Sequence, residues 1–72
     1  MPTQINPEKL LLSKWTAAVP QNKEKHFLVT QLLRDELEVV TGCVLEAVLT
    51  QRVQTLDWRV LQDETCWRQG WL

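Results

Sequence analysis

The sequence has few of the residues that build common catalytic and metal sites. In 72 residues there is no tyrosine, one phenylalanine, one histidine, two cysteines and two glycines. Two isolated glycines cannot form a P-loop, a dinucleotide-binding loop or a nucleophile elbow. His26 has no cysteine or carboxylate at ligand spacing around it, so a zinc site is not expected. The sequence therefore predicts no enzyme, no cofactor and no metal.

The two cysteines, Cys43 and Cys66, lie far apart in the chain and form no CxxC motif. A secreted domain of this size usually carries about four or more cysteines, paired as disulfides. We therefore expect both to be reduced, partly buried thiols. A redox pair or an intermolecular disulfide is the alternative.

The chain also lacks an excess of charge and a long apolar run. Eight basic residues face nine acidic ones, for a net charge of −1. This balance argues against nucleic-acid binding driven by the overall field, and against a basic helix on a membrane surface. No stretch approaches the roughly 20 apolar residues of a membrane span, and residues 1–13 do not resemble a secretory signal. We expect a soluble, cytoplasmic protein without a membrane partner.

What the chain does have is tryptophan. A chain of 72 residues predicts a single small domain over residues 1–72, whose core must bury apolar area densely. Each indole can bury about 150–250 Å². We therefore expect a mainly structural role for the four tryptophans, which are Trp15, Trp58, Trp67 and Trp71.

In the first third of the chain, short patterns predict a helical turn followed by a strand. The Asn-Pro-Glu run at residues 6–8 combines a favoured cap, a proline suited to the first helical position and an acidic first turn. It predicts one or two helical turns over residues 7–12. Alternate apolar positions over residues 13–19 predict a strand with Trp15 on its buried face. The polar residues 20–23, which begin with proline, predict a turn.

The middle of the chain favours strands, although one segment is ambiguous. Residues 26–33 are nearly all apolar, which predicts a central strand, and the charged residues 34–38 predict a connection. Gly42 predicts a bend or bulge. Residues 43–62 have apolar side chains at helical spacing, but also many β-branched residues and an apolar–polar alternation.

We favour a hairpin for the ambiguous segment, with its turn at Gln51–Arg52 and a returning strand at residues 53–58. At the end of the chain, residues 63–71 begin with a good cap and end near Gly70. They predict a single helical turn that brings Trp67 close to Trp71 at i+4 spacing.

The expected fold class is therefore mainly β. It is a small antiparallel meander of three or four strands with short N- and C-terminal helical turns, and it can curl into an SH3-like half-barrel. The alternative is an α+β fold with a helix over residues 43–61.

Several short strings are distributed along the chain: Asn6-Pro7, Lys9 to Thr16, Asn22-Lys23, Lys25 to Phe27, Asp57 to Arg59 and Trp67 to Trp71. Together they resemble a family of small bacterial tryptophan-rich proteins of unknown function. The resemblance extends over roughly residues 6–71 and implies a free-standing bacterial protein rather than a fragment of an enzyme. It implies no functional residues.

The candidate interaction surface combines tryptophans with neighbouring arginines, because a partly buried indole often lies at a binding surface. It consists of Trp58, Arg59, Trp67, Arg68 and Trp71. The most favoured function is a non-enzymatic protein-interaction module that binds an unidentified protein partner through this apolar surface. The alternative is weak binding of RNA or single-stranded DNA by stacking of bases between arginine and tryptophan. An exposed sheet edge on so small a domain also predicts a homodimer.

Overall fold

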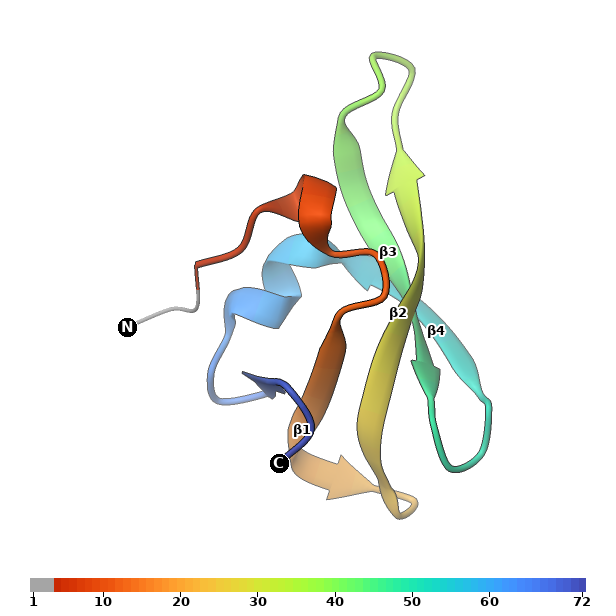
Figure 1. Cartoon of the computed structure of the whole chain (residues 1–72), viewed down its shortest axis with the longest axis vertical. Helices are drawn as coiled ribbons and strands as arrows, with labels where there is room; N and C mark the ends of the chain where they lie inside the picture. Colours follow the sequence, from red (N-terminus) through yellow and green to blue (C-terminus); the bar gives the residue numbers. More distant parts are fainter. Residues whose placement is uncertain (1–3) are drawn as a thin grey trace.

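The computed structural model describes residues 4–72; residues 1–3 of the predicted domain lie outside the described part. In this described part of the chain, five strands form one open antiparallel sheet in the order β4-β3-β2-β1-β5 (Figure 1). Within residues 4–72 the only helical segments are two 3-10 turns, η1 (Pro7–Lys9) and η2 (Trp58–Gln62). The strands are β1 (Lys14–Gln21), β2 (Glu24–Arg34), β3 (Val40–Ala47), β4 (Val53–Asp57) and β5 (Trp67–Gln69).

The mainly β, antiparallel prediction is confirmed, with five strands where three or four were expected. The predicted hairpin is present as β3 and β4, but its connection covers residues 48–52 and is longer than the predicted turn at Gln51–Arg52. The alternative helix over residues 43–61 is wrong. The ladder between β3 and β4 runs without a register shift from Gly42–Asp57 to Glu46–Val53. The ladder provides hydrogen-bond partners for the backbone of this segment, and the β-branched residues of the segment suit a pleated sheet. The SH3-like curl stays a prediction.

The N-terminal turn forms where expected, although it is shorter than predicted. The side chain of Asn6 accepts a hydrogen bond from the Glu8 N–H at 3.1 Å, as a helix cap does. The following turn is also shorter than the predicted residues 20–23. Asn22 and Lys23 both have positive φ, which is the geometry of a tight type I′ hairpin. Pro20 lies inside β1, in an irregular stretch of the β1–β2 ladder where its missing N–H is tolerated.

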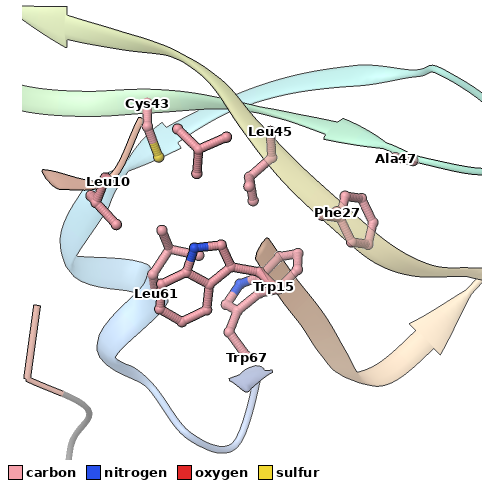
Figure 2. Packing of buried hydrophobic residues seen from close by; sticks show 9 residues of the cluster. Leu10, Trp15, Phe27, Cys43, Leu45, Ala47, Leu61 and Trp67 are labelled. Carbon is pink, nitrogen blue, oxygen red and sulfur yellow. The ribbon is translucent and has the colours of Figure 1, made fainter. Parts of the chain in front are cut away.

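The hydrophobic core lies on one face of the sheet, between the strands and the segments η1, η2 and β5 (Figures 1 and 2). Trp15 is at its centre with 0% of its surface exposed, which confirms its predicted burial. Its indole N–H donates to the Ser13 hydroxyl at 2.8 Å. Leu61 of η2 is fully buried in the same cluster. The core residues are Leu10, Trp15, Phe27, Val29, Cys43, Leu45, Ala47, Leu61 and Trp67.

Strand alternation directs a second set of side chains to the other side of the sheet, which we call the open face. Strand pairing places Leu28 beside Lys14 on one side and beside Glu46 on the other, and Glu46 pairs in turn with Val53. The open face consists of Lys14, His26, Leu28, Val44, Glu46, Val53 and Thr55, none of which is fully buried.

Gly42 lies next to a bulge, as its position predicted. The pairing of β2 with β3 shifts between Leu33–Gly42 and Arg34–Val40, which leaves Thr41 as the extra residue. A Cβ atom at Gly42 would lie 2.7 Å from the carbonyl oxygen of Leu56. Only glycine therefore allows β4 to approach β3 this closely.

The predicted helical turn over residues 63–71 is wrong. Residues 63–66 form a turn in which the N–H groups of Cys66 and Trp67 donate to the carbonyl oxygen of Asp63. Residues 67–69 form β5, which pairs with β1 through Trp15–Gln69, Thr16–Arg68 and Ala17–Trp67. A single helical turn has few internal hydrogen bonds and is marginal by itself, whereas β5 gains partners along the edge of β1. Trp67 and Trp71 consequently do not lie together on one helical face.

Candidate interaction surface

The five predicted surface residues do not form one continuous surface. Trp67, in β5, belongs to the core, where its ring meets Phe27 edge to face at 5.0 Å between centroids. This T-shaped geometry is favourable for aromatic pairs. Figure 2 shows the two rings on the core side of the sheet. Arg68, the next residue, is exposed, so of these two only Arg68 is available to a partner.

Trp71 lies on the opposite side of the sheet, next to the open face, and 42% of its surface is exposed. Its indole N–H donates to the carbonyl oxygen of Phe27 at 2.9 Å. The ammonium of Lys14 lies 4.8 Å from the ring centroid, and the ring of His26 is tilted against it at 5.9 Å. These three contacts fix one orientation of a large apolar ring at the surface.

The backbone around Trp71 is fixed as well. The hydroxyl of Thr16 donates to the carbonyl oxygen of Gly70 at 2.6 Å and accepts from the Leu72 N–H at 3.0 Å. The Nε2 of His26 lies 2.9 Å from the carbonyl oxygen of Leu72. Gly70 has a φ of +85°, a conformation suited to glycine, at the point where the chain leaves β5. The ring is therefore held by both its side-chain and its backbone contacts.

Trp58 and Arg59 begin η2 and form a separate pair. The Asp57 carboxylate accepts the Arg59 N–H at 2.9 Å, which caps this 3-10 turn. The guanidinium of Arg59 lies 5.0 Å from the centroid of the half-buried Trp58 ring. The buried indole N–H of Trp58 has no hydrogen-bond partner among the described residues. Arg59 also forms a solvent-exposed ion pair with Asp57 at 3.4 Å, and such pairs contribute little to stability.

The structure also contains a cleft that sequence reasoning did not identify. Its volume is about 360 Å³, with Phe27 and Trp67 among its lining residues. Glu24, only 5% exposed, lines it and accepts hydrogen bonds from Nε and Nη2 of Arg52 at 3.0 and 2.7 Å. The hydroxyl of Thr50 donates to the same carboxylate. The hydrogen bonds from Arg52 and Thr50 hold the pKa of Glu24 below its usual range.

The two thiols have different environments. Cys43 is fully buried, and burial, with a smaller effect of Asp57, raises its pKa to about 11. Cys66 is exposed rather than partly buried, and both thiols are free. Among residues 4–72 no group of three or more His, Cys, Asp or Glu side chains is placed to hold a metal ion. No helix within the same residues is long and apolar enough to cross a membrane.

Sequence reasoning identified Trp71 as a surface residue but missed Lys14 and His26, which contact its ring. Lys14 lies one position before Trp15, so its place on the opposite face follows from strand alternation. No local pattern connects His26 to Trp71, because they are 45 positions apart and meet only through the sheet. The pairing of Glu24 with Arg52 was missed for the same reason.

These features define a small antiparallel β domain whose core is built around indole rings. A family model described as Tryptophan-rich protein (DUF2389) matches residues 13–72, and the chain belongs to this family. The resemblance stated from the sequence is thereby confirmed, and the family is one of unknown function. No curated protein and no solved structure shows significant similarity to the chain.

Proposed function

We propose that this protein is a non-enzymatic protein-interaction module that binds a protein partner through Trp71 and the adjoining open face. One observation carries the proposal: a large, partly exposed indole is held in one orientation by Phe27, Lys14 and His26. Binding usually costs free energy for the ordering of side chains at the interface. A ring that is already ordered avoids much of this cost, and tryptophan is among the residues most often found to dominate interface energies.

The open face beside Trp71 supports the same proposal. Leu28 and Val44 provide apolar surface in the middle of the sheet, and Val53 is 62% exposed near its edge. Lys14 and Glu46 flank Leu28 in the row of paired residues. An apolar centre with polar groups of both signs at its border resembles the usual composition of protein interfaces.

The nucleic-acid alternative has less support from the same geometry. Stacking of bases requires accessible ring faces, yet Trp67 is buried and Arg59 already lies over the ring of Trp58. Arg59 is in turn paired with Asp57. The chain as a whole carries no positive excess that would attract phosphates.

The test compares two alanine variants of exposed apolar residues. Trp71→Ala removes the ring from the open face, whereas Leu37→Ala changes an 83% exposed side chain at the β2–β3 connection, away from that face. Both variants are checked for a native far-UV circular dichroism spectrum. The wild-type protein and the Leu37→Ala variant are expected to capture the same protein from an extract of the host cells, and Trp71→Ala is expected to lose it.

Two results would contradict the proposal. The first is capture that is equal for all three proteins, because Trp71 would then be dispensable. The second is binding of single-stranded RNA that weakens steeply with added salt, which would indicate phosphate contacts and favour the nucleic-acid alternative.

A further inference from the structure

The edge strand β4 lacks the features that normally prevent strand pairing between molecules. Proteins protect sheet edges with proline, lysine, bulges or very short strands. β5, at the other edge, has only three residues, and the end of β1 beyond β5 contains Pro20. β4 has five residues, neither proline nor lysine, and a regular ladder to β3. Figure 1 shows it at the border of the sheet, with no described strand beyond it.

The hydrogen-bond phase of β4 determines which backbone groups are free. The N–H of Ala47 donates to the carbonyl oxygen of Arg52 at 2.8 Å. In an antiparallel ladder, residues alternate between those bonded to the neighbouring strand and those directed away from it. The backbone N–H and C=O groups of Gln54 and Leu56 therefore point toward β3. Those of Val53, Thr55 and Asp57 point to the outer edge.

We infer that β4 pairs antiparallel with β4 of a second copy of this chain, about a twofold axis at Thr55. Thr55 is the middle residue of the strand, and its backbone groups point to the outer edge. A twofold axis at Thr55 therefore places each outward-pointing residue opposite an outward-pointing residue of the second copy, where their backbone groups can form hydrogen bonds. Thr55 then lies opposite Thr55 of the second copy, and Val53 lies opposite Asp57. The result is one continuous sheet across both copies, with an isologous interface typical of dimers.

The side chains of β4 fit this arrangement. Residues 53–56 carry no charge, and Asp57, at the end of the strand, lies opposite the uncharged Val53 of the second copy. On the core side, Gln54 lies opposite Leu56. No two like charges therefore face each other, whereas like charges directly opposite would destabilise the pairing. A net charge of −1 on each chain gives little overall repulsion.

The test is a charge-exchange experiment at Thr55, an exposed residue whose substitution leaves the core intact. Thr55→Lys places two ammonium groups opposite each other across the axis, and Thr55→Glu places two carboxylates there. In sedimentation at micromolar concentration, the wild type is expected at twice its 8.4 kDa chain mass. Each variant alone is expected at 8.4 kDa, and an equimolar mixture of the two is expected to recover the dimer mass.

Control variants separate this interface from other effects. Thr30→Lys introduces the same charge at an exposed threonine of the central strand β2 and is expected to leave the dimer intact. Trp71→Ala is also expected to remain dimeric, so a failure of this inference is distinguishable from a failure of the proposed function. A monomeric wild type, a dimeric Thr55→Lys variant, or a mixture that stays monomeric would each overturn the inference.

Discussion

Replacement of Trp15 by alanine tests whether one indole carries most of the stability of this domain. Trp15 is 0% exposed and lies at the centre of the core, in contact with the sheet on one side and η2 on the other (Figure 2). Within residues 4–72 its side chain makes one hydrogen bond, from the indole N–H to the Ser13 hydroxyl. The substitution therefore removes mainly apolar burial and leaves a cavity that the surrounding residues can fill only in part.

The expected cost follows from the buried area. An indole buries about 200 Å², which corresponds to about 5 kcal/mol at 25 cal/mol per Å². Alanine retains a small part of this burial, so a loss of about 3–5 kcal/mol is expected, as for other buried aromatic residues. In a domain of 72 residues the hydrophobic core rarely supplies more than about 3–5 kcal/mol of stability. The loss is as large as this whole contribution, so Trp15→Ala is expected to be largely unfolded at room temperature.

Trp71→Ala is the matched comparison, because it removes the same ring from a position that is 42% exposed. Trp71→Ala removes roughly half as much buried apolar area as Trp15→Ala, which predicts a loss of about 2 kcal/mol in the free energy of unfolding. Chemical denaturation followed by far-UV circular dichroism measures the stability of both variants without relying on tryptophan fluorescence. Trp15→Phe is included because it is expected to lose less stability than Trp15→Ala and to remain folded enough for its free energy of unfolding to be measured. If Trp15→Ala proves more stable than Trp71→Ala, the assignment of core and surface indoles is wrong.

Two further predictions concern titratable groups. Cys66 is expected to react with a thiol reagent at neutral pH in the folded protein, whereas Cys43, buried and with its pKa raised to about 11, is expected to react only on unfolding; equal rates would contradict this. The pKa of Glu24 is lower in the folded state than in the unfolded state. The ionised carboxylate therefore stabilises the fold at a pH above its unfolded-state pKa of about 4.3, and this stabilisation is lost as the pH falls through its folded-state pKa. Denaturation at pH 7 and pH 3 is expected to show a smaller loss of stability for Glu24→Gln than for the wild type, and an equal loss would refute the role of this carboxylate.

The parts of the fold that the sequence predicted correctly are those determined by local patterns. Apolar alternation before Val19 placed Trp15 on the buried side of a strand, and β-branched residues favoured the hairpin of β3 and β4 over a helix. The Asn6 cap also formed as expected. In each case neighbouring residues supply the decisive interactions, so a short window of sequence contains the necessary information.

The parts that were missed depend on contacts between distant segments. The run from Asp63 to Trp71 contains acceptable helix signals, and its first residues form a turn closed at Asp63. Residues 67–69 nevertheless form a strand, because the edge of β1 offers them a ladder. Local preferences of a few residues are weak compared with such tertiary contacts. The pairing of β5 with β1 also determines which indole is accessible to a partner. It buries Trp67 against Phe27 and leaves Trp71 on the other side of the sheet.

The two proposed interfaces, the β4 edge and the surface around Trp71, can be occupied at the same time, and pairing at β4 can strengthen binding at Trp71. Pairing at β4 uses backbone groups at the sheet edge, whereas Trp71 lies near Lys14 and His26 at the other end of the row of strands. A dimer about Thr55 would therefore leave both indoles accessible and join the two open faces into one sheet. A partner with two matching sites would then gain from effective concentration without any new contact. Loss of pairing would weaken capture of such a partner even with Trp71 intact, whereas loss of Trp71 would abolish capture by monomer and dimer alike.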